Sequence, residues 1–172
     1  MSIPDKQAFH HLIQENRRII YKICNSYCRN AQDREDLAQE IIYQLWRSGH
    51  SFNADHKFST WMYRIALNTA ISFYRKSALP SKTVPLTEHV IDMAPDTDPD
   101  TITGERIGRL QELILAMNEL DRALILLYLE EKSHREISEI LGISVSNVGT
   151  KIGRIKEKLK EQFSTNEKIT RI

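Results

Sequence analysis

Proline placement divides this chain more strongly than any other feature of its sequence. Four of the five prolines fall between residues 80 and 99 of the 172-residue chain. Because proline has no amide hydrogen and its ring clashes with the preceding helical turn, no helix is expected to continue through this stretch. On both sides of it, apolar residues recur every three or four positions, which is typical of amphipathic helices. The sequence therefore predicts an all-α protein of two small helical domains, at residues 1–78 and 105–172, joined by a flexible linker at 79–104.

The N-terminal domain is predicted to contain three helices. Apolar residues from Phe9 to Tyr27 form one stripe, which predicts a single long helix. A second helix is expected to begin at Asp33 as N-cap and to end at Gly49. Ser59 is the predicted N-cap of a third helix, whose apolar side chains from the first to the last turn lie on one face.

The C-terminal domain carries the strongest local signals. Helical periodicity resumes near Thr103 and continues through residues 120–131. Ser133 and Glu136 have the spacing of a capping box, and the short helix that they open is expected to end at Gly142.

A long basic helix is predicted to follow, from Val145 to about Gln162, with Ser144 as its cap. A helix, a glycine-containing turn and a second helix form the helix-turn-helix pattern of DNA-binding proteins. A plain helical hairpin is the alternative interpretation of this pattern.

The formal net charge of +1 conceals three segregated blocks. Residues 56–87 hold five basic side chains and no acidic one, residues 88–105 hold six acids and no base, and residues 145–160 hold five bases and one acid. Exposed charges act over a screening length of about 10 Å, so each block acts on its own surroundings. The near-zero net charge of the whole chain is therefore no argument against a nucleic-acid partner.

The third helix combines basic with aromatic side chains. Such a combination suits single-stranded nucleic acid, because bases stack on rings and the backbone follows the positive charge. Trp61 and Phe73 also lie on the apolar stripe, so packing in the core is the competing interpretation for both.

The sequence lacks the signals of several other protein classes. No apolar run approaches the roughly 20 residues that cross a bilayer, and the N-terminal residues are charged where a signal peptide is apolar, so we expect a cytoplasmic protein. Neither a Gly-rich phosphate loop nor HExxH or GxSxG is present, so we expect no enzyme activity and no cofactor. Cys24 and Cys28 are one turn apart and are predicted to be buried thiols rather than a metal site completed by His10 or His11.

Segments on both sides of the linker resemble bacterial RNA polymerase sigma factors of the extracytoplasmic-function (ECF) class. The N-terminal match runs through DREDLAQEIIYQLWRS (Asp33–Ser48) and FNADHKFSTWMYRIALNTAISFYRK (Phe52–Lys76). The C-terminal match runs from Leu120 to about Glu161 and includes EILGIS. The resemblance implies a sigma factor that binds core RNA polymerase and directs promoter recognition, DNA melting and transcription initiation.

The resemblance also implies roles for individual residues. The helix with the DLAQE pattern would contact the clamp helices of the beta-prime subunit of core polymerase through Arg34, Asp36, Gln39, Glu40, Gln44 and Arg47. The third helix and the loop before it would capture the melted minus-ten element on the non-template strand through Lys57, Trp61, Arg64, Asn68, Arg75 and Lys76.

The C-terminal domain would dock on the flap of the beta subunit and read the duplex minus-thirty-five element. Short polar side chains at the start of its long helix would reach base edges, and Lys and Arg further along would hold phosphates. These residues are Ser146, Asn147, Gly149, Thr150, Lys151, Arg154, Lys156 and Lys158. Gly149 and Gly153 either allow close approach to DNA or are tolerated on an exposed face.

Further hypotheses concern the linker, a protein partner and an alternative function. The acidic stretch of residues 88–105 is expected to imitate nucleic acid inside the polymerase, and an anti-sigma factor is considered as a further partner because many family members have one. The alternative function is a stand-alone helix-turn-helix regulator with an N-terminal dimerisation or sensing domain, which would bind palindromic duplex DNA without polymerase.

Overall fold

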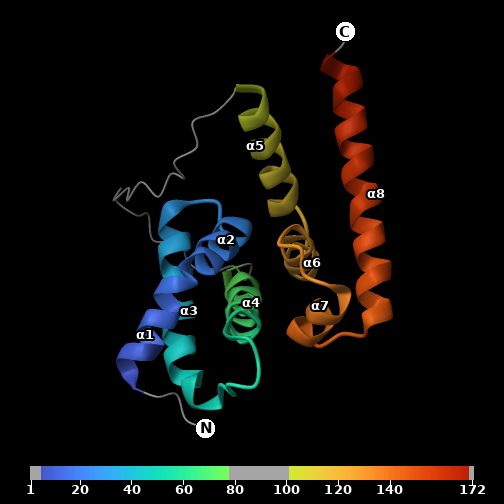
Figure 1. The fold of residues 1–172 in the computed structure, drawn as a ribbon. Helices are drawn as coiled ribbons and strands as arrows, with labels where there is room; N and C mark the ends of the chain where they lie inside the picture. The colour runs from blue at the N-terminus through green and yellow to red at the C-terminus, as the bar shows by residue number, and fades with distance from the viewer. Residues whose placement is uncertain (1–4, 78–100, 171–172) are drawn as a thin grey trace.

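The computed structural model describes residues 5–77 and 101–170 (Figure 1). Within these ranges the chain forms eight α-helices, one short 3-10 helix and no strand, which confirms the predicted all-α class. The predictions made for the linker, including its acidic stretch up to Asp100, fall mainly on residues 78–100 and lie outside the described residues.

The N-terminal domain is built from helices that bury a shared apolar face. They are α1 (Lys6–Glu15), α2 (Arg17–Tyr27), α3 (Ala31–Ser48), the 3-10 helix (Gly49–Ser51) and α4 (Phe58–Ser77).

The prediction of one helix from Phe9 to Tyr27 is wrong, because the helix is divided at Asn16. The Asn16 side-chain amide donates to the Leu12 carbonyl at 2.9 Å, which ends α1, and the Asn16 carbonyl accepts from the Ile19 amide at 3.0 Å as α2 begins. The apolar phase continues across this break, so both helices still bury one face.

Two predicted N-caps are also corrected. The cap of α3 is Asn30 rather than Asp33: the Asn30 side-chain oxygen accepts from the Asp33 amide at 2.8 Å. Helix α4 begins at Phe58, so Ser59 lies inside its first turn instead of before it. The end of α3 at Ser48, next to Gly49, agrees with the prediction.

The C-terminal domain consists of α5 (Thr101–Leu115), α6 (Glu119–Leu129), α7 (His134–Leu141) and α8 (Val145–Thr170). The apolar pattern that was expected to continue through residues 120–131 therefore belongs to two helices. Asn118 caps the second of them, since its side-chain oxygen accepts from the Asp121 amide at 2.9 Å. Helix α5 begins within the segment assigned to the linker, and α8 continues beyond Gln162.

The helix-turn-helix signals are confirmed in detail. The Glu136 amide donates to the Ser133 hydroxyl at 3.1 Å and the Ser133 amide to the Glu136 carboxylate at 3.0 Å, which completes the capping box. Gly142 ends α7 with φ of 70°, a conformation that glycine adopts without steric cost. The Ser144 hydroxyl caps α8 by accepting from the Asn147 amide at 3.1 Å.

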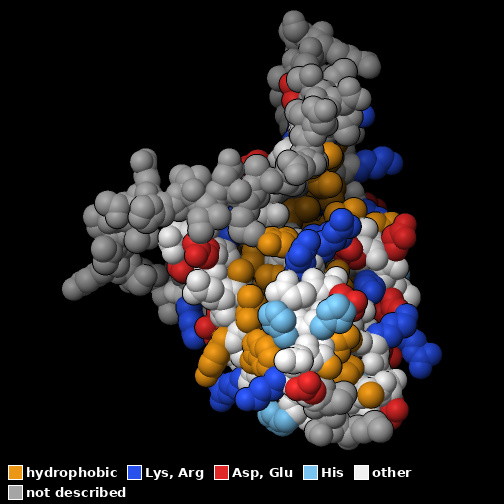
Figure 2. Space-filling model, turned by 60° about the vertical axis from the view of Figure 1, so that its left-hand side comes forward, with side chains coloured by type: hydrophobic (Ala, Val, Ile, Leu, Met, Phe, Trp, Pro, Cys, Tyr) orange, Lys and Arg blue, Asp and Glu red, His pale blue; other side chains and the backbone are white. Residues whose placement is uncertain are grey.

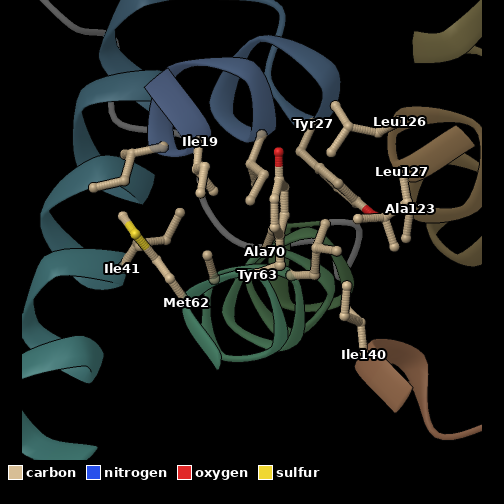
Figure 3. Close-up of a cluster of buried hydrophobic side chains, with 14 of the residues drawn as sticks. Ile19, Tyr27, Ile41, Met62, Tyr63, Ala70, Ala123, Leu126, Leu127 and Ile140 are labelled. Carbon is tan, nitrogen blue, oxygen red and sulfur yellow. The ribbon is translucent and has the colours of Figure 1, made fainter. Parts of the chain in front are cut away.

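The two domains pack against each other and share one hydrophobic core (Figure 3). Helix α2 of the N-terminal domain contacts α5 and α6 of the C-terminal domain, and α4 contacts α6 and α7. In Figure 3, Tyr27 of α2 points toward Ala123 and Leu127 of α6. Helix α8 packs on α6 and α7.

Candidate nucleic-acid interface

An aromatic cluster surrounds the start of α4. The rings of Phe58 and Trp61 lie 5.4 Å apart, and the Phe52 ring from the preceding loop lies 5.4 Å from each of them. Phe9 of α1 packs edge-on at 6.0 Å from Trp61 and at 4.9 Å from Trp46 of α3. Trp61 is half-buried, so part of its indole packs in this cluster and part stays accessible.

A hollow of about 440 Å³ opens beside Trp61. Most of its wall comes from α4 and from the loop before it, but Glu139 comes from α7 of the other domain. The lining residues are Ser51, Phe52, Asn53, His56, Thr60, Trp61, Arg64 and Glu139. Aromatic rings, an amide and a guanidinium in one hollow can stack a base, form a hydrogen bond with its edge and bind its phosphate.

Three lining residues of this hollow, Phe52, Asn53 and His56, were not singled out from the sequence. The available signal was the loop FNADH, which carries an aromatic ring, an amide and an imidazole and ends two residues before the first residue of α4.

A second hollow, of about 590 Å³, lies between α3 and α4. Asn68 and Lys76 line it, together with Asp36, Glu40 and Gln44, which were predicted to bind polymerase. Asn68 also lies one helical turn after Arg64, so it stands between the two hollows along α4. The full lining is Asp36, Glu40, Gln44, Asn68, Thr69, Ser72, Phe73 and Lys76.

The charged and polar side chains predicted to bind the minus-ten element are exposed, namely Lys57, Arg64, Asn68, Arg75 and Lys76. Arg75 is engaged by the other domain, because its Nε donates to the Glu119 carboxylate at 2.9 Å. A hydrogen bond from its own backbone amide, and then the bond from Arg75, lower the pKa of Glu119.

The start of α8 presents its short polar side chains to solvent. Ser146, Asn147 and Thr150 are exposed, and the Thr150 hydroxyl donates to the Ser146 carbonyl at 3.1 Å. Gly149 faces the imidazole of His134 on α7, which a β-carbon at this position would meet at 3.6 Å.

The basic side chains of α8 do not all share one face. Lys151 is half-buried, whereas Arg154 and Lys158 are exposed. The Lys156 ammonium lies 4.2 Å from the centre of the Tyr128 ring of α6. The contact of Lys156 with a DNA phosphate stays a prediction.

Figure 2 shows one face of the molecule, on which Lys, Arg and His side chains alternate with apolar and acidic ones instead of forming a uniformly positive sheet. Such a mixed surface suits a subunit that shares DNA contacts with a larger partner, because binding DNA alone requires many phosphate contacts.

The family of the chain follows from its relatives. Models for sigma-70 region 2 and for sigma-70 region 4 match residues 12–79 and 107–159. The chain is 34% identical over 169 residues to the ECF RNA polymerase sigma factor SigW of Bacillus subtilis (strain 168), covering 92% of this chain and 90% of SigW. The chain belongs to the ECF class of sigma factors. The ECF RNA polymerase sigma-E factor of Haemophilus influenzae is 29% identical, covering 92% of this chain and 89% of that protein.

A solved structure shares the fold of both domains of this sigma factor. It is CnrH in complex with the cytosolic domain of CnrY, with a TM-score of 0.67 at 20% identity, covering 94% of this chain and 90% of CnrH. The function predicted from the motifs is confirmed: the protein is a sigma factor that directs RNA polymerase to promoters.

Helix α3 of the sigma factor exposes most of the residues assigned to polymerase binding. Asp36, Gln39, Glu40 and Arg47 are exposed and Gln44 is half-buried, with its amide 3.0 Å from the Glu40 carboxylate.

Arg34 of the same assigned set is half-buried, like Gln44, and its charge acts on the thiols of Cys24 and Cys28. The Asp36 carboxylate also acts on Cys28, so both side chains lie near the junction of α2 and α3.

Three large apolar side chains of α3 are also exposed and were missed by the sequence analysis. Tyr43 is 58% exposed, Ile42 39% and Trp46 37%. The sequence does carry a signal for them: the apolar stripe of α3 is wider than the single face that the helix buries.

The two cysteines are buried, as predicted. Burial raises the pKa of Cys24 and that of Cys28 to about 12 each, so both thiols are protonated near neutral pH. In residues 5–77 and 101–170, no three His, Cys, Asp or Glu side chains are arranged to hold a metal ion. No helix in the described part of the chain is long and apolar enough to span a membrane.

Proposed function

We propose that the N-terminal domain captures the melted minus-ten element in the hollow beside Trp61. The observation that carries this proposal is the shared lining of the hollow by Trp61, Phe52, Asn53 and Arg64. A base leaving the duplex loses stacking worth a few kcal/mol. The half-buried indole replaces that stacking, and Arg64 offsets the charge of the adjacent phosphate.

Core polymerase binds the exposed face of α3 in this proposal. An interface needs an apolar centre with a polar rim, and α3 offers Ile42, Tyr43 and Trp46 next to Gln39 and Arg47. The partner surface is the clamp helices of the beta-prime subunit, as the family resemblance implies.

The remaining assigned residues act on the duplex upstream. The first two turns of α8 read the minus-thirty-five element through Ser146, Asn147 and Thr150, with Arg154 on the phosphates. The C-terminal domain also docks on the beta flap. None of these binding events makes or breaks a covalent bond, so the proposed role is that of a binding subunit and not of an enzyme. The proposed place of action is the cytoplasm.

An anti-sigma factor is included among the proposed partners. Support comes from the relative of the same fold, CnrH, which was solved in complex with the cytosolic domain of CnrY. Because CnrH and this chain share a fold at low sequence identity, the proposal is for an anti-sigma factor in general and not for a partner like CnrY in particular.

Run-off transcription with purified core polymerase tests this function. We expect the protein to bind core and to support transcripts from a cognate promoter fragment, and Arg64→Ala to reduce promoter opening more than core binding. Glu15→Gln on α1, an exposed residue outside both hollows, is the matched control. Failure to bind core, together with tight unaided binding to palindromic duplex DNA, would instead favour the stand-alone regulator.

A further inference from the structure

One face of α8, the recognition helix of the helix-turn-helix, has few side chains that can reach DNA. Ser146, Gly149, Thr150 and Gly153 are spaced at i, i+3, i+4 and i+7, so they share this face. Ser146 and Thr150 are short and exposed, and the Thr150 hydroxyl already donates to the Ser146 carbonyl. The two glycines add no side chain, so the face can approach a groove closely but offers few groups that bond to base edges.

A side chain from the neighbouring helix lies against this face. The imidazole of His134, the first residue of α7, faces Gly149. A β-carbon at position 149 would lie 3.6 Å from Nδ1 and 3.7 Å from Cε1 of this ring. Because glycine has no side chain, the space next to the backbone of α8 is free for the imidazole.

The edge of the imidazole that carries Nε2 is turned away from α8. Nδ1 and Cε1 are the only ring atoms within 4 Å of the β-carbon position at Gly149. His134 is exposed, and its imidazole forms no hydrogen bond or ion pair with any other residue in the described ranges 5–77 and 101–170. A neutral imidazole has one N–H donor and one acceptor nitrogen, so the ring of His134 has hydrogen-bonding capacity that the protein does not use.

The position of this ring in the motif brings it to duplex DNA. In a helix-turn-helix, the second helix enters the major groove and the first crosses the sugar-phosphate backbone. The side chain of His134 starts on the first of these helices, α7, and lies against the second, α8. It therefore extends from the backbone toward the base edges, which present acceptors such as guanine N7 and O6 and thymine O4 in the major groove.

We propose that His134 is a specificity-determining residue of the minus-thirty-five contact, whose Nε2–H donates to an acceptor on a base edge beside Gly149. The inference rests on the function proposed above for α8 and deepens it, because it adds a residue of α7 to the surface that reads the duplex. It also gives Gly149 a role, which is to leave room for the imidazole.

Selection from a promoter library tests this assignment. Holoenzyme is assembled from purified core polymerase and the full chain, and it is bound to duplex fragments randomised at the minus-ten and minus-thirty-five elements. The bound fragments are sequenced, so the selection itself defines the preferred base at each position. His134→Ala removes the ring, and His134→Gln places an amide donor near the position of Nε2. His10→Ala removes an exposed histidine from α1 in the other domain and is the control.

His134→Ala is expected to reduce discrimination roughly fivefold to tenfold at one or two adjacent minus-thirty-five positions and to leave the minus-ten preference unchanged. His134→Gln should retain part of the lost discrimination. Thermal melting of each variant shows whether the chain stays folded, as expected for changes at an exposed position.

Three outcomes would overturn the assignment. An unchanged minus-thirty-five preference in His134→Ala, or an equal change in His10→Ala, overturns this inference alone. A uniform loss of affinity for all sequences, with a salt slope reduced by about one, places the ring on a phosphate and overturns the base contact. If wild-type holoenzyme selects no minus-thirty-five sequence, the function proposed for α8 fails and this inference fails with it.

Discussion

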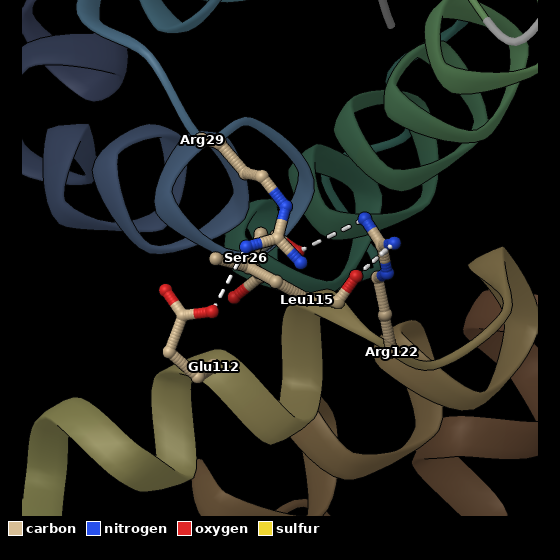
Figure 4. A network of polar contacts seen from close by, with 5 residues as sticks. All are labelled: Ser26, Arg29, Glu112, Leu115 and Arg122. Atoms are coloured by element: carbon tan, nitrogen blue, oxygen red, sulfur yellow. Dashed lines mark hydrogen bonds and ion pairs between the residues drawn. The ribbon is translucent and has the colours of Figure 1, made fainter.

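The guanidinium carbon of Arg122 lies 4.4 Å from the centre of the Tyr74 ring. Arg122 belongs to α6 and Tyr74 to α4, so this cation-π contact joins the two domains of the sigma factor. The Tyr27 ring of α2 lies 5.6 Å from the same carbon. This arginine is removed from water, and in residues 5–77 and 101–170 no carboxylate forms a hydrogen bond with it. Ring faces and backbone carbonyls, among them those of Ser26 and Leu115 (Figure 4), compensate for its lost hydration.

Arg122→Met is expected to lower the free energy of unfolding by about 2 kcal/mol or more, because methionine fills the space but leaves buried carbonyls without a donor. Urea denaturation followed by circular dichroism measures the loss. Arg135→Met on α7, where the side chain is 86% exposed, is the matched control and should change stability by less than about 0.5 kcal/mol. Equal effects of the two substitutions would show that the Arg122 bonds contribute nothing beyond those of a surface arginine.

Trp61 and Asn68 are expected to respond differently to truncation. Trp61→Ala removes a ring that packs against Phe9, Phe52 and Phe58, so it should cost about 2 kcal/mol of stability and also impair promoter opening. Asn68→Ala changes an exposed side chain and should impair opening with little change in melting temperature. Thermal melts and permanganate footprinting of the open complex separate the two effects. Full activity of a destabilised Trp61→Ala protein would identify Trp61 as a packing residue only.

Much of the fold was predictable because helical periodicity and capping chemistry are local. The capping box at Ser133, the αL glycine at 142 and the Ser144 cap were all found from short-range spacing. The break at Asn16 was missed because the apolar phase of α1 continues into α2, so the pattern contains no irregularity there. Asn30 and Asp33 are both residue types that are preferred at an N-cap. Only the structure shows which side chain accepts from which backbone amide, so the sequence could not decide between them.

The site was predictable only in part, because contacts between distant segments have no local signature. Trp61 and Arg64 share a hollow as their one-turn spacing suggests, but the spacing does not show that Glu139 of α7 completes its wall. Arg122 does have a local signature: it is the single cation in the apolar run LDRALILLYL, and a cation buried in such a run needs hydrogen-bond acceptors around it.

Alkaline pH should destabilise the sigma factor through its buried thiols. The pKa of Cys24 and that of Cys28 are raised to about 12 by burial, against about 8.5 in an unfolded chain. The folded state therefore favours the protonated thiols, and this stabilisation is complete below about pH 8.5 and is lost as the pH rises toward 12. Burial also raises the pKa of Tyr27 and of Tyr63, which adds to the loss at the upper end of the range.

Denaturant unfolding at a series of pH values from 7.5 upward checks this expectation, with Cys24→Ala/Cys28→Ala as the comparison. The double variant should lose less stability between pH 8.5 and 10.5 than the parent chain. At pH 8 the native thiols should react with a thiol reagent only as fast as the protein unfolds. Rapid reaction of folded protein would contradict the burial of both side chains.

Lys151→Ala and Arg154→Ala test the phosphate contacts of the recognition helix. Each substitution should reduce the salt slope of minus-thirty-five binding by about one if the side chain contacts a phosphate. Lys156→Ala is the comparison within the same helix, because its ammonium lies over the Tyr128 ring and should contribute less. Electrophoretic titrations of the holoenzyme at several salt concentrations give the slopes, and a larger change for Lys156 than for Arg154 would mean that the reading face is misplaced.

The two glycines of α8 allow stability and DNA reading to be separated. A β-carbon at Gly153 would meet nothing within 4 Å, and one at Gly149 would make an ordinary contact of 3.6 Å with the His134 ring. Alanine at either position should therefore stabilise the helix by up to about 1 kcal/mol, since glycine is the poorer helix former. If DNA approaches the backbone at Gly149 or Gly153, the same alanine will weaken minus-thirty-five binding while the melting temperature rises. Unchanged binding with a higher melting temperature would show instead that the glycines are merely tolerated on an exposed face. The decisive comparison is each single variant against wild type, measured by thermal melting and by holoenzyme binding to a promoter fragment with and without the upstream element.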